Sequence, residues 1–159
     1  MKFTAQEEYG LRCLLQIARH DTGGILTIPE IAWVEGLSIH YVAKLMRILR
    51  RGGFVKSARG QAGGYTLARP PEQIIVGEVL AVLGGRLFAQ NFCELHAGLM
   101  KLCTHSVDCS IRSLWSTVQR VVDQLLGTTT LKDLLCGELE MRSWIDTVSE
   151  DPLKVLSRR

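Results

Sequence analysis

The arrangement of helix caps and glycines that begins at Thr27 constrains the fold more than any other feature of the sequence. Thr27 is a suitable N-cap for a short helix, because Glu30 can complete a capping box and Gly36 is a good terminator. Ser38 can then cap a longer, basic helix over residues 38–53. A helix, a tight glycine-containing turn and a basic second helix predict a helix-turn-helix motif, whose second helix enters the major groove of DNA.

The residues that follow this motif predict a β-hairpin wing. Residues 54–58 and 65–68 alternate as strands, and the sequence RGQAGG at residues 59–64 is rich enough in glycine for a tight turn. From such a wing, Arg59 and Gln61 reach along the phosphates or into the adjacent minor groove, where a narrow groove attracts arginine. The sequence therefore predicts a winged helix-turn-helix DNA-binding domain.

The basic charge of the chain is concentrated in the same segment. The 159 residues have a formal net charge of +3. Residues 36–71 contain seven basic side chains and no acid, whereas the remainder holds 12 basic and 16 acidic side chains, a balance of −4. The seven are Lys44, Arg47, Arg50, Arg51, Lys56, Arg59 and Arg69. Charge runs usually mark a solvated surface, but together with the helix-turn-helix and wing patterns this one predicts binding to double-stranded DNA.

Candidate DNA-contacting residues lie on the predicted second helix and on the wing. An apolar stripe of that helix is expected to face the core, and it consists of Val42, Leu45, Met46 and Leu49. The residues that we expect at DNA are Ser38, His40, Tyr41, Lys44, Arg47, Arg51, Arg59 and Gln61. Contacts to base edges provide specificity, whereas neutralised phosphates release counterions, so we expect the affinity to fall steeply with salt.

The remaining periodicity is mainly helical. Apolar residues at helical spacing predict a first helix from Thr4 to Arg19 and a short helix over residues 76–83. A long helix from Asp108 to Leu126 has apolar residues every three or four positions, a seam suited to packing on another helix. This predicted dimer interface consists of Ile111, Leu114, Trp115, Val118, Val121, Val122 and Leu125.

These elements divide the chain into four parts, and the predicted fold class is mainly α. Residues 1–83 form the DNA-binding domain, and residues 84–107 form a cysteine-containing loop. Residues 108–136 contain the long dimerisation helix and a last short helix, which Thr130 can cap. Residues 137–159 give a weaker signal, and we expect this extension to be partly disordered at its end.

Three cysteines are gathered between the wing domain and the long helix. Cys93, Cys103 and Cys109 lie within seventeen residues, in a polar stretch where three thiols are unusual as core filling. The other two, Cys13 and Cys136, fit helical apolar patterns as small buried residues. The gaps of nine and then five residues lack the Cys-x-x-Cys pairs typical of structural zinc sites. Three thiolates with a fourth ligand from elsewhere suit an iron-sulfur cluster, and zinc or a metal-free thiol switch stays open.

Several absences in the sequence limit the class of protein. No run approaches the ~18 apolar residues of a membrane span, and the N-terminus lacks the apolar region of a signal peptide. We therefore expect a cytoplasmic protein without a membrane partner, where thiols are kept reduced. The chain has no HExxH motif, no Ser-His-Asp order and no phosphate-binding glycine loop followed by lysine. The sequence accordingly predicts neither an enzyme nor a small-molecule substrate.

The order of elements and several strings resemble the IscR/NsrR group of the Rrf family, bacterial winged-helix regulators that bind iron-sulfur clusters. The resemblance runs from Met1 to about Leu135 and is most specific in RGQAGGYTLAR at the wing, followed by IIVGEVLAVL and the three-cysteine loop. The string TTTLKDLL after the long helix also matches. The resemblance implies a homodimeric transcription factor whose long helices cross, and in which the state of the cluster sets operator affinity.

Two departures bear on the ligand set that the resemblance implies. In the IscR branch a histidine three residues after the last cysteine is a ligand, and Arg112 stands there. In the NsrR branch an aspartate on the first helix of the partner subunit completes the cluster, and Glu8 stands there. The implied metal ligands are Cys93, Cys103, Cys109 and Glu8, with [4Fe-4S] favoured over [2Fe-2S]. His96 and His105 stay alternatives to Glu8, and a redox, nitric oxide or iron-sulfur signal is implied.

Overall fold

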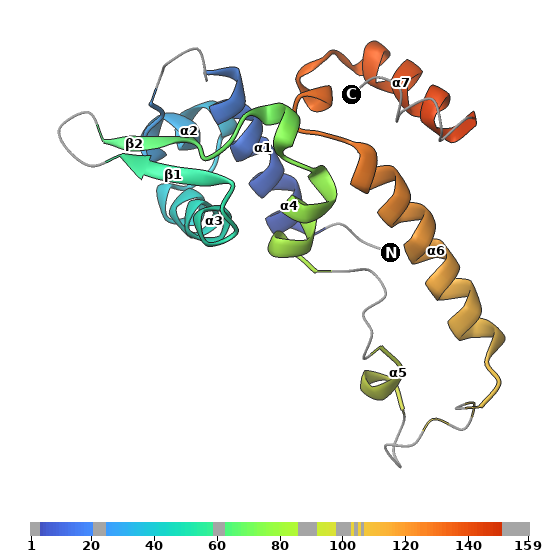
Figure 1. Ribbon diagram of the computed structural model, residues 1–159. Coiled ribbons are helices and arrows are strands. Elements are labelled where there is room, and N and C mark those ends of the chain that lie inside the picture. Colours follow the sequence, from blue (N-terminus) through green and yellow to red (C-terminus); the bar gives the residue numbers. More distant parts are fainter. Residues whose placement is uncertain are drawn as a thin grey trace.

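The computed structural model describes residues 4–20, 25–58, 63–85, 92–97, 103, 105 and 107–150. Its elements in chain order are α1 (Ala5–Arg19), α2 (Ile28–Glu35), α3 (Ile39–Arg51), β1 (Val55–Ala58), β2 (Gly64–Leu67), the 3-10 turn η1 (Pro71–Gln73), α4 (Val76–Leu83), α5 (Phe92–Leu95), α6 (Ser110–Thr128), the 3-10 turn η2 (Asp133–Leu135) and α7 (Glu138–Glu150). The fold is mainly α with one small antiparallel hairpin, as the sequence predicts (Figure 1).

The helix caps and the turn predicted for the helix-turn-helix motif are confirmed. The Thr27 hydroxyl accepts the backbone N–H of Glu30 at 3.4 Å, and the Glu30 carboxylate accepts the Thr27 N–H at 2.8 Å, which completes the capping box of α2. Gly36 ends α2 with a φ of 65°, a left-handed conformation that favours glycine. The Ser38 hydroxyl caps α3 by accepting the N–H of Tyr41 at 3.2 Å.

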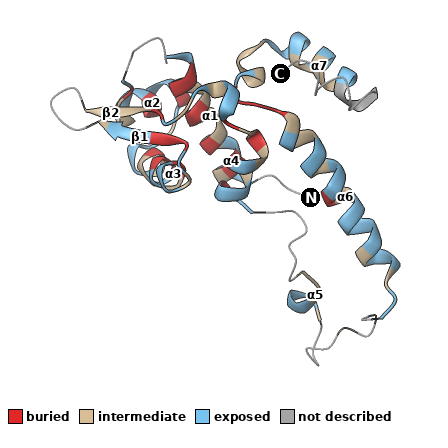
Figure 2. Ribbon diagram, in the orientation of Figure 1, coloured by how far each residue is buried: buried red, intermediate tan, exposed pale blue. Residues whose placement is uncertain are grey.

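The core of the predicted DNA-binding domain lies where α1, α3, α4 and the hairpin meet. The α3 stripe predicted to face inward is fully buried, with 0 % exposure at Val42, Leu45, Met46 and Leu49. It packs in one cluster with Leu14 of α1 and Val79 of α4. Each such side chain contributes about 1.5–3 kcal/mol when it leaves water. Burial of this stripe turns the opposite, basic face of α3 toward solvent (Figure 2).

The wing is an antiparallel pair of short strands. Val55 pairs with Leu67 and Ala58 with Gly64, so β1 and β2 begin and end within one residue of the predicted strands. A further bridge joins Leu26 to Tyr65 through backbone hydrogen bonds of 2.8 and 3.1 Å. The wing is thus tied to the segment that precedes α2.

The long helix α6 begins at its end far from the winged-helix unit and runs toward that unit, and most of its surface is exposed (Figures 1 and 2). Its C-terminal end is fixed to the start of α4, because the Val76 N–H donates to the Thr129 carbonyl at 2.9 Å. The Leu131 N–H likewise donates to the Ile74 carbonyl at 2.8 Å. The helix spans Ser110–Thr128, shifted by two residues from the prediction because Cys109 is its N-cap.

The C-terminal elements differ from the prediction. Thr130 bonds to Asp133 before η2: its hydroxyl and N–H donate to the Asp133 carboxylate at 2.7 and 2.8 Å, and its hydroxyl oxygen accepts the Asp133 N–H at 3.3 Å. The N-cap of η2 itself is Lys132, which makes no side-chain cap hydrogen bond. The helix predicted after Thr130 is wrong in length, because only the single 3-10 turn η2 forms and Cys136 is extended. Residues 138–150 of the weak-signal extension form α7, and residues 151–159 lie outside the described part. Among the described helices, none has the length and apolar character to cross a membrane.

Candidate nucleic-acid interface and sensor segment

The exposed face of α3 presents most of the residues that the sequence assigns to DNA contact. The exposed members of that set are Ser38, His40, Lys44, Arg47 and Arg51. Ser38 is occupied as the N-cap, so its hydroxyl oxygen already accepts a backbone N–H. With the opposite face buried, α3 offers a row of cations on one side, which is the arrangement that phosphate and base contacts require.

Tyr41 behaves differently from its neighbours on α3. It is half-buried, and its ring packs edge-on against Tyr9 of α1, with ring centroids 6.0 Å apart and an interplanar angle of 86°. The Lys44 Nζ lies 5.8 Å from the centre of the Tyr41 ring. Tyr41 therefore joins α1 to the basic face, in addition to the base contact predicted for it.

Fewer of the predicted DNA contacts on the wing than on α3 lie within the described residues. Arg59 and Gln61, the two predicted wing contacts, lie outside the described residues. Lys56 of β1 is exposed beside them in sequence, and the Arg50 guanidinium donates to the Ser57 hydroxyl at 3.5 Å. Arg50 thus connects the end of α3 to the first strand of the wing, which extends the basic surface from α3 onto the hairpin.

The turn between α2 and α3 is held from α1. Glu35 is buried, and its carboxylate accepts the Arg12 Nε–H at 2.5 Å and the Gln16 side-chain N–H at 2.6 Å. The Arg12 guanidinium also donates to the Glu35 carbonyl at 3.3 Å. Because Glu35 directly precedes Gly36, these bonds fix the place where the chain turns toward α3.

The clustered cysteines are all free and partly buried. Cys93 lies on the single-turn helix α5, and Cys109 is the N-cap of α6, where its Sγ accepts the backbone N–H of Arg112 at 3.3 Å. Among the described residues, no three His, Cys, Asp or Glu side chains already converge on one point. The donor chemistry nevertheless fits an iron-sulfur cluster, because the iron of such clusters is held mainly by cysteine thiolates and this segment carries three free cysteines.

The two histidines of the segment are both exposed. His96 stacks on Phe92, with ring centroids 4.1 Å apart, and its Nδ1 lies 2.8 Å from the Phe92 carbonyl. Since a carbonyl only accepts hydrogen bonds, Nδ1 carries the proton in this contact and Nε2 faces away from it. His105 is exposed beside Cys103 in sequence.

Glu8 lies at the far end of α6 from the cysteines of its own chain. Its exposed side chain lines a largely apolar cavity of about 260 Å³, together with Leu11, Leu125 and residues of α7 such as Met141. From Cys109 to Leu125 the helix advances about 24 Å along its axis. In this arrangement Glu8 and Cys109 of one chain do not approach each other.

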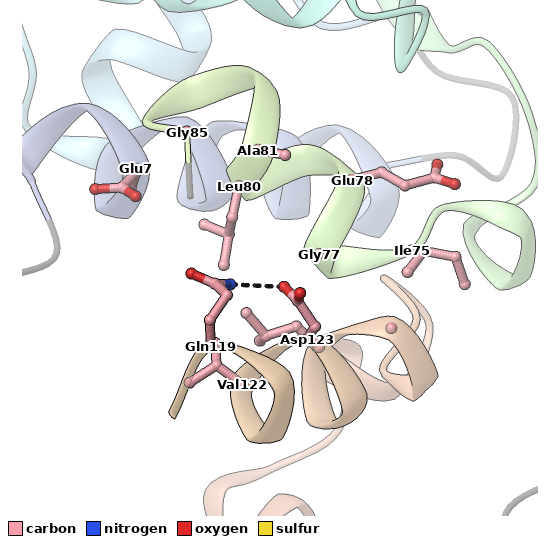
Figure 3. A pocket seen from close by; sticks show the side chains of 12 residues that line it. Glu7, Ile75, Gly77, Glu78, Leu80, Ala81, Gly85, Gln119, Val122 and Asp123 are labelled. Atoms are coloured by element: carbon pink, nitrogen blue, oxygen red, sulfur yellow. Dashed lines mark hydrogen bonds between the residues drawn. The ribbon is translucent and has the colours of Figure 1, made fainter. Parts of the chain in front are cut away.

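A second cavity, of about 470 Å³, lies between α4 and α6 (Figure 3). Leu80 and Gly77 of α4 face Val122 of α6 across it, and the Gln119 side chain donates to the Asp123 carboxylate at 2.7 Å on the α6 wall. Val122, one of the predicted dimer residues, therefore faces its own chain.

The remaining residues of the predicted dimer interface on α6 are more exposed. Exposure is 59 % at Ile111, 57 % at Leu114, 42 % at Trp115 and 61 % at Val121. Val118 and Leu125 are half-buried, as is Val122. Four large apolar side chains exposed along one helix form a patch that monomers seldom leave in water.

The two cysteines assigned to packing differ from each other. Cys13 is fully buried, and burial, followed by the negative charge of Glu35, raises the pKa of its thiol to about 12. Cys136 is only half-buried, and its Sγ donates to the Asp133 carbonyl at 2.7 Å. Cys13 is thus the inert core residue that the sequence predicts. Cys136, the residue that ends η2, is half-buried and is not the core residue that the sequence predicts.

Comparison with known proteins decides the family. The sequence profile of the Rrf2 family, described as an iron-dependent transcriptional regulator, matches residues 3–137. The chain belongs to the Rrf2 family. It is 36 % identical over 135 residues to protein rrf2 of Nitratidesulfovibrio vulgaris, which covers 85 % of this chain and 87 % of that protein.

Solved structures of similar proteins have the same fold as this chain. The Rrf2 chain is similar to CymR, the global cysteine regulator of Bacillus subtilis, with a TM-score of 0.70, 30 % identity and coverage of 85 % of this chain and 96 % of that one. It is also similar to IscR of T. potens, with a TM-score of 0.67, 33 % identity and coverage of 85 % and 86 %. CymR of Bacillus subtilis and IscR of Xenorhabdus nematophila, both relatives of this chain, are named HTH-type transcriptional regulators, so the Rrf2 chain is a DNA-binding winged-helix regulator and not an enzyme.

Two features of this Rrf2 regulator were missed by sequence reasoning. Arg50 counts among the basic residues, yet its link to Ser57 was not expected. The Arg12–Glu35 pair joins residues 23 positions apart, and no local spacing indicates it. Its only sequence signal is an acid at a helix C-terminus, where the helix dipole disfavours negative charge unless a cation lies nearby.

Proposed function

We propose that this Rrf2 regulator is a homodimer that senses redox, nitric oxide or iron-sulfur status through an iron-sulfur cluster. In each sensor site the ligands are Cys93, Cys103 and Cys109, completed by Glu8 of the partner subunit. The observation that carries this proposal is the placement of three free, partly buried cysteines on one segment that ends as the N-cap of α6. When bound, the cluster supplies a redox-active iron centre whose properties depend on its ligands and solvent exposure.

Exposed apolar residues of α6 support the dimer. Ile111, Leu114 and Val121 are more than half exposed on a helix that projects from its own domain. Packing this seam on the same seam of a second copy removes the apolar patch from water, as homodimer interfaces do. Two winged-helix units held in this way read two half-sites about 34 Å apart, which is one turn of DNA.

The position of Glu8 supports its donation across the dimer. Within one chain, Glu8 lies beside the C-terminal end of α6, whereas Cys109 caps the N-terminal end. If two α6 helices cross with opposite directions, the N-terminal end of one lies near the C-terminal end of the other. Glu8 of the partner subunit then comes to the cysteines, which Glu8 of the same chain does not reach.

A carboxylate is a hard ligand and a weak partner for a soft iron-sulfur cluster, so this position is the labile one. Loss of the Glu8 contact breaks the link between the two subunits at that point. This alters the relative placement of the two α3 helices. Allosteric couplings of about 1–3 kcal/mol correspond to changes in operator affinity of about 5- to 150-fold. The resemblance to the NsrR branch favours [4Fe-4S] over [2Fe-2S].

Anaerobic isolation tests the cluster. We expect a brown protein with charge-transfer absorption and stoichiometric iron and acid-labile sulfide, and we expect the Cys103→Ala variant to lose all three. Cys136→Ala is the matched control, because Cys136 is equally half-buried and should leave the iron content unchanged. Glu8→Ala should retain less cluster after exposure to oxygen, and an unchanged spectrum and oxygen stability in Glu8→Ala would show that another ligand is used.

A second candidate is a regulator without a cluster that uses its thiols as a redox switch. The similarity to CymR, the global cysteine regulator of Bacillus subtilis, favours it. Colourless protein from anaerobic, iron-replete cells that binds DNA differently after oxidation and after dithiothreitol treatment would support the switch and exclude the cluster.

A further inference from the structure

One face of α1 carries three polar or aromatic side chains whose contacts reach the helix-turn-helix motif. Tyr9, Arg12 and Gln16 follow the spacing i, i+3, i+7, which places their side chains on one side of a helix. Arg12 and Gln16 hold the buried carboxylate of Glu35 at the end of α2, through hydrogen bonds of 2.5 and 2.6 Å. This anchor fixes the turn that leads into α3.

Tyr9 makes the second connection, to α3 itself. Its ring meets the Tyr41 ring edge-on at 6.0 Å, and the Arg12 guanidinium lies 5.4 Å from the centre of the Tyr9 ring. The Lys44 ammonium in turn lies 5.8 Å from the centre of the Tyr41 ring. A continuous series of ring contacts therefore leads from α1 to an exposed cation on the DNA-facing side of α3.

We propose that Tyr9 is a positioning residue that holds Lys44 in its DNA-binding orientation through Tyr41, and that it transmits displacements of α1 to the DNA contact. The transmission part rests on the proposed function, because Glu8 is the neighbour of Tyr9 on the same helix. A helix moves as a rigid body over such a short distance, so a shift imposed at Glu8 displaces the Tyr9 ring with it.

The physical basis is the restriction of a long side chain. A lysine ammonium has many rotamers, and contact with an aromatic face lowers the free energy of those that lie over the ring. Edge-to-face aromatic pairs are worth about 0.5–1.5 kcal/mol, a factor of about 2 to 10 in an equilibrium constant. If Tyr41 loses its support from Tyr9, the ring and the ammonium above it become less ordered, and DNA affinity falls by about that factor.

A double-mutant cycle tests the positioning role without reference to any cluster. The probe is a labelled duplex about 30 base pairs long, enough for two half-sites, selected from a randomised pool by the wild-type protein. With chelator-treated protein, Tyr9→Leu should weaken binding about 2- to 10-fold, but leave affinity unchanged in the Lys44→Ala background. Tyr9→Phe retains the ring and should bind like the wild type. Equal losses in both backgrounds would overturn the proposal.

Leu15→Ala is the control for a merely structural effect. Leu15 is half-buried on the same helix and packs on the same core, so its truncation also loosens α1. Its effect on affinity should be the same with Lys44 and with Ala at position 44. A coupling energy between Leu15 and Lys44 as large as that between Tyr9 and Lys44 would show that general loosening of α1, and not the ring contact, is responsible.

The transmission part is tested by the ratio of affinities before and after iron removal. Tyr9→Leu should bring this ratio closer to one, whereas Tyr9→Phe should leave it as in the wild type. A wild-type ratio that persists in Tyr9→Leu overturns the transmission and leaves the proposed sensor standing. Protein that never contains iron overturns the sensor, while the cycle on chelator-treated protein still decides the positioning role. Absence of salt-sensitive binding to any duplex overturns both.

Discussion

The Cys109 Sγ accepts the backbone N–H of Arg112 at 3.3 Å, so one of the three clustered cysteines is also the N-cap of α6. The first N–H groups of a helix lack partners within it, and negative charge is favoured at this end. A sulfur held here is therefore in a position that suits an anionic metal ligand. The same atom orders the start of the helix that carries the proposed dimer seam.

Serine at position 109 separates these two roles. In Cys109→Ser the hydroxyl still caps α6, but a hard oxygen replaces the soft sulfur, so we expect iron and sulfide to be lost. Compared as chelator-treated proteins, Cys109→Ser and the wild type should have similar helicity and unfolding free energy. Cys109→Ala should lose both the metal ligand and the cap of α6, and loss of the cap should lower the unfolding free energy by about 1 kcal/mol. Iron and sulfide assays and urea unfolding measure the two effects. Full iron content in Cys109→Ser would remove Cys109 from the ligand set.

The cations of α3 should account for much of the salt dependence of DNA binding. Each phosphate contact that is removed lowers the slope of log affinity against log salt by about 1. We expect Arg47→Ala to lower the slope by this amount, measured by fluorescence anisotropy over a range of salt concentrations. Arg142→Ala is the matched control, because Arg142 is an exposed arginine on α7 that pairs with Glu138 at 3.0 Å. Equal slopes in both variants would mean that α3 is not the DNA-contacting surface.

The parts of the fold that could be predicted are those set by local interactions. Capping boxes, the left-handed turn at Gly36 and the buried stripe of α3 depend on residues within one or two helical turns of each other. The sequence alone therefore placed α1, α2, α3 and the wing to within one or two residues. It also placed the exposed cations, because burying one face of α3 leaves the other for solvent.

The parts that were not predicted depend on contacts between distant residues. Arg12 meets Glu35 because α1 and α2 pack together, and Tyr41 is half-buried against the core, with Tyr9 of α1 lying across from its ring. The helix α7 was assigned to a weak-signal extension, although Met141, Trp144 and Ile145 follow helical spacing. In short helices such a weak local preference is decided by packing, and here Met141 and Ile145 line the cavity beside α1 and α6.

An acidic substitution in the seam should separate the subunits. Val121 is 61 % exposed on α6, and Val121→Asp places a charge in an interface that would otherwise exclude water, so we expect a monomer by sedimentation equilibrium. Leu139→Asp on α7 is the control, because Leu139 is 81 % exposed and outside the seam. Val121→Asp protein that keeps the wild-type mass would show that α6 does not form the dimer.

Cys13 should be the unreactive cysteine of the cluster-free protein. The thiolate is the form that reacts with alkylating reagents, and burial raises the pKa of Cys13 to about 12. Iodoacetamide at neutral pH should therefore modify Cys93, Cys103, Cys109 and Cys136 in native protein, and Cys13 only after denaturation. Peptide mass spectrometry identifies the modified residues. Rapid labelling of Cys13 in the native state would mean that α1 opens from the core.

The same raised pKa makes stability depend on pH in a defined direction. Above about 9.0, the ordinary value for a thiol, Cys13 loses its proton in the unfolded chain but keeps it in the folded one. The unfolded state then binds fewer protons, so the unfolding free energy falls as pH rises from about 9 to about 12, by at most about 1.4 kcal/mol per pH unit. Cys13→Ala lacks this contribution, so the difference in urea midpoint between wild type and Cys13→Ala should shrink over that range. A difference that stays constant would mean that Cys13 titrates at the same pH in both states, and hence that its sulfur is not buried in the folded regulator.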